Sequence, residues 1–243
     1  MNYEKLAGSI RAVIDRRPED SGAYSDLFSL CREWETEDFS AAHKLNKELL
    51  TLSADQVRHG GGVKFYEQWR RCLLFEAPHD FDSFMTYIEL DRKPEKRFYA
   101  PRKHYLRPMV QGFQDVLDGK LRLLTISMPK RAGKSQTGIN FVNMLSGKFP
   151  DRSTLMEGTG DDLVKSFYNG CLEYLTVPNE YLFYDVFPDA RLVQTNADTK
   201  TVNLKSKSRF PTIMCRSIDA RQVGLSEATN VLYLDDCVEG REE

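Results

Sequence analysis

The stretch that decides the fold reads Leu121-Arg-Leu-Leu-Thr-Ile-Ser-Met-Pro-Lys-Arg-Ala-Gly-Lys-Ser135. Residues 121–127 are short and largely apolar, and they predict a β-strand. Residues 135–146 predict a helix that stops at Gly147. A strand that runs through a loop into Gly-Lys-Ser at a helix start is the setting that a phosphate-binding loop requires.

Each residue of this loop suits phosphate chemistry. Gly133 lets the backbone approach a phosphate closely, Lys134 reaches the β and γ phosphates, and the Ser135 hydroxyl is placed to bind Mg²⁺. Backbone amides at the helix start add further donors. The predicted ATP-binding residues are Pro129, Lys130, Arg131, Ala132, Gly133, Lys134, Ser135 and Gln136. Met128 stands where the usual pattern has its first glycine, and a capped surface helix is the alternative interpretation.

A second motif is Val231-Leu-Tyr-Leu-Asp235-Asp236, four apolar residues followed by two acids. It predicts a buried strand that delivers carboxylates to the C-terminal edge of a sheet, where ligands bind in such folds. We expect Asp235 to hold Mg²⁺ opposite Ser135 and Asp236 to orient the attacking water. Glutamate is usual in that last role, and Glu239 is the fallback. A strand followed by an acidic turn is the alternative, but phosphoryl transfer needs both a phosphate cradle and a metal carboxylate.

The order of the remaining patterns predicts an α/β fold. Strands are expected at 153–156, 201–204, 210–214 and 231–234, and a helix at 161–174, which implies a parallel sheet flanked by helices. The first 92 residues read as a small helical region, in which Leu6, Ile10, Val13 and Ile14 share one helix face. Residues 93–104, rich in proline and basic residues, predict a linker. Residues 105–243 then form the predicted ATPase core, a P-loop NTPase of the additional-strand, catalytic-acid type.

Composition narrows the class of protein. The 243 residues are 41% hydrophobic and carry a net charge of −2, so nucleic-acid binding requires a local basic patch. Five scattered cysteines predict neither a disulfide framework nor a zinc site, and the four histidines show no metal-ligand spacing in the sequence. No apolar run reaches the length of a membrane span, and no signal peptide is visible, so neither secretion nor a membrane partner is expected.

The loop and its flanks resemble a known family. Pro129-Lys-Arg-Ala-Gly-Lys-Ser135 is similar to the deviant phosphate loop of phage terminase large subunits. The segment from Tyr105 to Gly119 is similar to the helix that precedes that loop, and Phe187-Pro188 also matches. Arg221-Gln-Val-Gly-Leu225 leads into the acidic strand end as in the family. The resemblance covers about residues 97–243.

What the resemblance implies is a viral DNA-packaging motor. Such a motor couples Mg²⁺-dependent ATP hydrolysis to the translocation of double-stranded DNA into a procapsid in the host cytoplasm. Its partners are the portal protein and the small terminase subunit, and it assembles as a homo-oligomeric ring. Family members carry further sheet strands and a nuclease domain after the acidic strand, so nuclease activity is expected only from residues beyond Glu243.

The resemblance also implies roles for residues around the loop. A basic residue in the loop senses the γ phosphate, and Arg131 stands at that place, with Lys130 as the alternative. Tyr99, Arg102 and Tyr105 are candidates for the adenine pocket by position and stacking chemistry, although ordinary packing of a linker explains them equally well.

Two further features concern neighbours. Ring motors use an arginine from the next subunit, and Arg221 is the candidate for this catalytic role, with Arg216 as a second. Two solvent-facing arginines without a catalytic role are the alternative. Lys200, Lys205, Lys207 and Arg209 form a basic cluster without an acid. The last three alternate, so an extended chain would align them along a DNA backbone. A solvated hairpin tip is the alternative.

Two other functions compete with that of a packaging motor. They are a helicase-like or other P-loop ATPase, and a nucleotide-binding scaffold without turnover.

Overall fold

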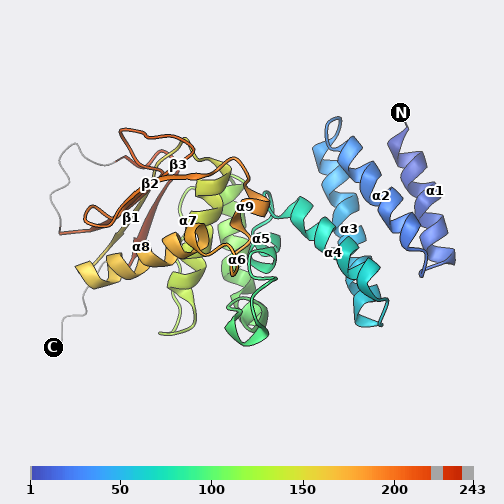
Figure 1. The fold of residues 1–243 in the computed structure, drawn as a ribbon, viewed down its shortest axis with the longest axis horizontal. Helices are drawn as coiled ribbons and strands as arrows, with labels where there is room; N and C mark the ends of the chain where they lie inside the picture. The colour runs from blue at the N-terminus through green and yellow to red at the C-terminus, as the bar shows by residue number, and fades with distance from the viewer. Residues whose placement is uncertain (1, 220–226, 237–243) are drawn as a thin grey trace. The chain divides into compact units, whose positions relative to one another are not determined.

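The computed structural model describes residues 2–219 and 227–236 and divides into two compact units, Met1–His79 and Asp80–Glu243 (Figure 1). The division falls earlier than the expected boundary at residue 92. The reason lies in the aromatic side chains of the segment that follows. Phe81 contacts Phe113 and Phe141 with ring centroids 5.7 and 5.5 Å apart, so this segment belongs to the core of the second unit.

The first unit contains four helices: α1 (Tyr3–Arg16), α2 (Ser21–Trp34), α3 (Phe39–Arg58) and α4 (Val63–Glu76). Polar residues begin three of them, because a side-chain oxygen satisfies an N–H group that the helix leaves open. Asn2 accepts from Lys5, Asp20 from Gly22 and Ala23, and Asp38 from Ala41. The core of this unit is formed by Ala7, Ile14, Ala23, Tyr24, Leu27, Leu30, Leu49, Phe65 and Cys72.

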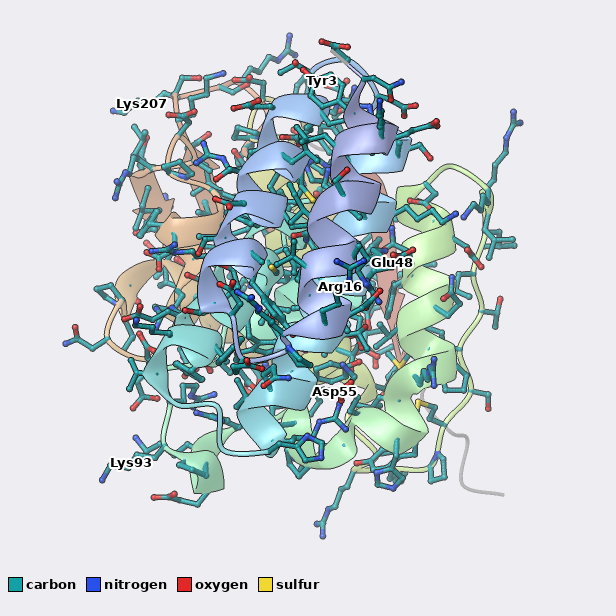
Figure 2. The ribbon with its side chains drawn as sticks, turned by 90° about the vertical axis from the view of Figure 1, so that its right-hand side faces the viewer. Tyr3, Arg16, Glu48, Asp55, Lys93 and Lys207 are labelled. Atoms are coloured by element: carbon teal, nitrogen blue, oxygen red, sulfur yellow. The ribbon has the colours of Figure 1, made fainter. Side chains whose placement is uncertain are left out.

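The expected apolar face of the first helix is only half correct. Ile14 is buried and Ile10 packs against the core, but Leu6 and Val13 are each 41% exposed. Ala7 takes the place at the core that the spacing had given to its larger neighbour. Tyr3 and Arg16 mark the two ends of this helix in Figure 2, beside Glu48 of α3, which pairs with Arg11 at 3.7 Å.

The second unit begins with α5 (Phe81–Tyr87) and two 3-10 turns, η1 (Pro94–Lys96) and η2 (Ala100–Arg102). The helices α6 (Lys103–Leu117), α7 (Lys134–Lys148), α8 (Asp161–Thr176) and α9 (Phe183–Val186) follow. The expected linker at 93–104 is therefore folded. Its backbone is fixed by Glu89, which accepts from the amides of Phe98 (2.8 Å) and Tyr99 (3.0 Å).

Within residues 2–219 and 227–236, the sheet has five strands in the order β2-β3-β4-β1-β5. These are β1 (Thr154–Gly158), β2 (Leu192–Asn196), β3 (Thr201–Leu204), β4 (Ile213–Ser217) and β5 (Val231–Asp235). Strand β1 pairs in parallel with both β4 and β5, whereas β2 and β3 extend the sheet in antiparallel pairs. The unit is therefore an α/β fold flanked by helices, as expected, with a mixed sheet.

The prediction of a strand at 121–127 is wrong. These residues form no ladder in the described part of the chain, and Leu123 is 82% exposed. A strand needs a neighbour for its backbone groups, and a short apolar run does not supply one by itself. The helices predicted at 135–146 and 161–174 are confirmed. A strand forms at 231–235, but the expectation that it is buried is wrong, because it stands at an edge of the sheet and Leu232 and Leu234 are 49% and 53% exposed. Strand β2, which is polar and mostly exposed, was not predicted.

Among the described residues, no helix is both long and apolar enough to cross a bilayer.

Candidate functional site

The site begins where helix α7 begins. Gly133 has φ +100°, a left-handed conformation that glycine adopts at little cost, and the helix starts at the next residue, Lys134. Thr137 donates its backbone N–H (3.0 Å) and its hydroxyl (2.9 Å) to the Gly133 carbonyl. No side chain in the described chain caps the helix start, so its first amides keep their capacity to bind an anion.

The end of strand β5 supplies the carboxylates. Asp235 is 1% exposed and stands in register with Gly158 of β1. A Cβ on Gly158 would lie 2.9 Å from the Asp235 carbonyl oxygen, so the two strand ends approach as closely as a glycine permits. Thr159 donates its hydroxyl to the Asp236 carbonyl at 2.6 Å, which holds the turn after the strand.

Lys134 joins the helix start to the strand end. Its Nζ lies 3.0 Å from Oδ1 of Asp235 and also pairs with Oδ1 of Asp236. Partial burial lowers the pKa of Lys134, but the two carboxylates outweigh that effect, so the pKa lies above its usual value and the ammonium stays charged. Two motifs about one hundred residues apart in the chain thus meet through one ion-pair cluster.

The loop before the helix exposes its basic side chains. Arg131 has φ +65°, and the Ala132 amide donates to the Pro129 carbonyl at 3.3 Å, which closes a tight turn. Lys130 and Arg131 are both exposed, so their positions do not distinguish which of them would meet a γ phosphate.

The residues upstream of the loop differ in their surroundings. Tyr99 is 1% exposed and its hydroxyl bonds to Asp82, so its ring is part of the core and not open for stacking in this conformation. Arg102 stacks over the ring of Phe98 at 5.1 Å, and a Cβ on Gly133 would meet that ring at 2.8 Å. Phe98 is thus the aromatic neighbour of the loop that the sequence analysis missed.

Three other predicted residues have clear positions. Tyr105 is 40% exposed and contacts the ring of His104. Ser135 is half-buried in the first turn of α7, next to Lys134. Gln136 donates to the Tyr174 hydroxyl of α8 at 3.2 Å, which commits its side chain to helix packing.

A groove of about 380 Å³ runs beside the site, between residues 122–126 and residues 231–234, and both Lys134 and Asp236 line it. It runs along β5, which is one of the two edge strands among the described strands. Leu232 and Leu234 are 49% and 53% exposed there. The segment predicted as a strand therefore borders this edge without pairing with it.

The basic cluster does not form the expected row. Strand β3 ends at Leu204, and Lys205 has φ +62°, so the residues after it are not an extended continuation. Lys205 pairs with Asp151 at 2.7 Å and Lys200 with Asp161 at 2.8 Å, so carboxylates distant in the sequence neutralise two of the four charges. Lys207, labelled in Figure 2, is exposed.

Of the two arginines proposed for a subunit contact, the structure describes only Arg216. Arg216 lies within strand β4, opposite Glu157 of β1. Arg221 and the fallback acid Glu239 lie outside the described residues.

Comparison with known proteins found no similarity: no family model, no curated protein and no solved structure matches this chain.

Proposed function

We propose that the second unit binds Mg²⁺-ATP at the start of α7 and hydrolyses it. One observation carries this proposal: a lysine at an uncapped helix start pairs with a buried aspartate at the end of a parallel strand. An uncapped helix start and an ammonium form an anion site, and the adjacent buried carboxylate is a ligand for the metal that accompanies a nucleoside triphosphate.

The position of each residue in the site suggests its role in ATP hydrolysis. The β and γ phosphates would displace the carboxylates from Lys134 and accept from the amides of the first helical turn. Asp235, freed from the ion pair, would face the Mg²⁺ that Ser135 also binds. Asp236 is accessible and would orient water, and Arg131 or Lys130 would contact the γ phosphate. On the Gly133-Lys134-Ser135 motif and the acidic end of β5, we assign this site to the P-loop type of the additional-strand, catalytic-acid class.

Double-stranded DNA translocation in a packaging motor stays our proposal for the cellular role, on the resemblance to terminase large subunits described above. The portal protein, the small terminase subunit and a homo-oligomeric ring belong to the same proposal. Within the basic cluster, Lys207 and Arg209 are exposed, and we expect these two residues to contact the phosphate backbone of DNA.

The test is phosphate release by the purified chain with Mg²⁺-ATP, with and without duplex DNA. Lys134→Ala should abolish the turnover. Lys120→Ala is the matched control, because Lys120 also pairs with two carboxylates, at 2.7 and 3.7 Å, but on the surface. Equal turnover by Lys134→Ala and wild type would overturn the site, and turnover insensitive to DNA would argue against the motor role only.

A further inference from the structure

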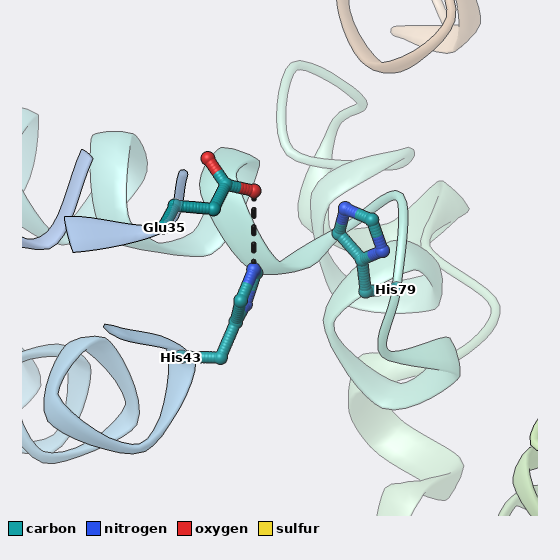
Figure 3. A group of neighbouring side chains, drawn as sticks. All are labelled: Glu35, His43 and His79. Carbon is teal, nitrogen blue, oxygen red and sulfur yellow. Dashed lines mark hydrogen bonds and ion pairs between the residues drawn. The ribbon is translucent and has the colours of Figure 1, made fainter. Parts of the chain in front are cut away.

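Three potential metal ligands meet in the first unit, far in the chain from the nucleotide site. Glu35 caps the end of α2, His43 lies in α3, and His79 follows α4 (Figure 3). One ligand atom from each lies within 4.8 Å of the others. Their separation in the sequence explains why the histidines showed no metal-ligand spacing there.

A buried carboxylate orients the central histidine. Nδ1 of His43 lies 3.0 Å from Oε1 of Glu76, whose side chain is 1% exposed. Asn46 donates to the same oxygen at 2.8 Å and thereby fixes it. With the proton on Nδ1, the Nε2 lone pair faces Glu35 at 3.3 Å (Figure 3). A carboxylate that holds the distal ring nitrogen in this way is the usual support of a metal-binding histidine.

Aromatic rings surround the cluster. The His43 ring stacks on Phe75 at 4.6 Å, and Phe39 contacts both His43 (4.0 Å) and His79 (4.9 Å). Such packing restricts the rotamers of both imidazoles, so little freedom would be lost when an ion binds. An open groove lined by Phe39, Ser40 and His43 gives an ion a path to the cluster.

We propose that Glu35, His43 and His79 bind one Zn²⁺-class divalent ion, with water as the fourth ligand. Bonds of about 2.0–2.1 Å in a tetrahedron separate adjacent ligand atoms by about 3.3 Å, which is the distance between His43 Nε2 and Glu35 Oε1. His79, half-buried in the turn after α4, offers the third ligand atom, within 4.8 Å of the other two. Two neutral imidazoles with the carboxylates of Glu35 and Glu76 would balance the charge of the ion.

The competing arrangement uses the same residues without metal. A protonated His43 would form an ion bridge between Glu35 and Glu76, and His79 would only pack against it. The two arrangements differ in what His79 does: as a ligand it contributes to ion affinity, whereas as a packing residue it does not.

The test is calorimetric titration of the full chain with Zn²⁺, and with Co²⁺ read by the visible absorption of the four-coordinate ion. We expect one ion per chain, at least tenfold weaker binding in both His79→Ala and Glu35→Gln, and no change in His59→Ala. His59 is the control, because it is an exposed histidine of the same unit whose ring contacts only the Asp55 carbonyl in the described contacts, at 2.7 Å.

Three results would overturn the proposal. The first is that the wild-type chain binds no ion, which would support the ion bridge without metal. The second is that both variants bind the ion as tightly as wild type does. The third is that Asp235→Asn abolishes the binding, which would place the ion at the nucleotide site. Circular dichroism of each variant separates a lost ligand from a lost fold. Because Glu35 and His79 are both partly exposed, their replacement removes no buried core side chain.

Discussion

Two adjacent aspartates hold Lys134, and they differ sharply in burial. The Asp235 side chain is 1% exposed, whereas that of Asp236 is 62% exposed. The sequence motifs predicted that Lys134 and Asp235 share one site, because phosphoryl transfer requires both a phosphate-binding loop and a carboxylate that binds the metal. The same reasoning missed the histidine cluster, because its members come from three helical segments whose packing no spacing rule encodes.

We expect Asp235→Asn and Asp236→Asn to separate metal binding from hydrolysis. Asp235→Asn removes the metal carboxylate, so turnover should fall and the Mg²⁺ concentration required should rise. Asp236→Asn should bind Mg²⁺-ATP normally but lose about 10²-fold or more in turnover, the usual contribution of a general base. Steady-state phosphate release against Mg²⁺ concentration measures both effects. Wild-type turnover in Asp236→Asn would transfer the role to Glu239.

The reactivity of the buried cysteine thiols tests whether the hydrophobic cores are packed as the structure shows. Cys31, Cys72, Cys171 and Cys215 are all buried and free, and burial raises the pKa of Cys215 to about 12. At pH 8 about one thiol in ten thousand with that pKa is a thiolate, the form that reacts. Iodoacetamide should therefore modify these four only after unfolding, as mass spectrometry of the digested chain would show. Rapid native modification of Cys171 or Cys215 would contradict the packing of α8 against β4.

Helices could be predicted from local sequence patterns, whereas strands depended on contacts with neighbouring strands that the sequence does not show. Helices α7 and α8 carry long periodic patterns with clear ends, and both were predicted. The run at 121–127 has the composition of a strand but borders β5 without pairing, and composition does not report a partner. Strand β2 escaped prediction for the opposite reason: its pairing with β3 forms a strand from a polar segment.

The packing of α7 on β5 depends on a glycine. A Cβ on Gly138 would lie 2.2 Å from the Tyr233 hydroxyl, while a Cβ on Gly8 of α1 would meet nothing within 4 Å. We expect Gly138→Ala to destabilise the second unit by about 1–3 kcal/mol through overpacking. Gly8→Ala, the matched helical control, should stabilise the first unit by about 0.5–1 kcal/mol. Urea unfolding measures both, and stabilisation by Gly138→Ala would refute the contact.

The boundary between the two units of the chain depends on the packing of aromatic side chains, which the sequence pattern does not reveal. The expected boundary at residue 92 relied on a change of composition, which marks the basic, proline-rich segment 93–104. The structure divides the chain at His79, because Phe81 and Phe84 contact aromatic side chains of the second unit. Which of two cores an aromatic side chain joins depends on long-range contacts, and local patterns do not record them.

We expect residues 1–79 to fold alone. Their four helices enclose a core of their own, and three helices begin with side-chain caps. The isolated segment should show a helical circular dichroism spectrum and a single cooperative thermal transition. A spectrum of unfolded chain, or a gradual loss of signal without a transition, would show that the unit depends on the remainder of the protein.

We propose that Lys134 and its loop bind a nucleoside triphosphate, and every other role assigned to the second unit depends on this binding. The most direct measurement is an isothermal titration of the chain with Mg²⁺-ATP, repeated with AMP and with Lys134→Ala and Lys120→Ala. We expect one ATP per chain, much weaker binding of AMP, and an ATP affinity lowered at least about tenfold, or 1.4 kcal/mol, in Lys134→Ala alone. Equal ATP affinity in wild type and Lys134→Ala, or no binding by the folded wild-type chain, would contradict it.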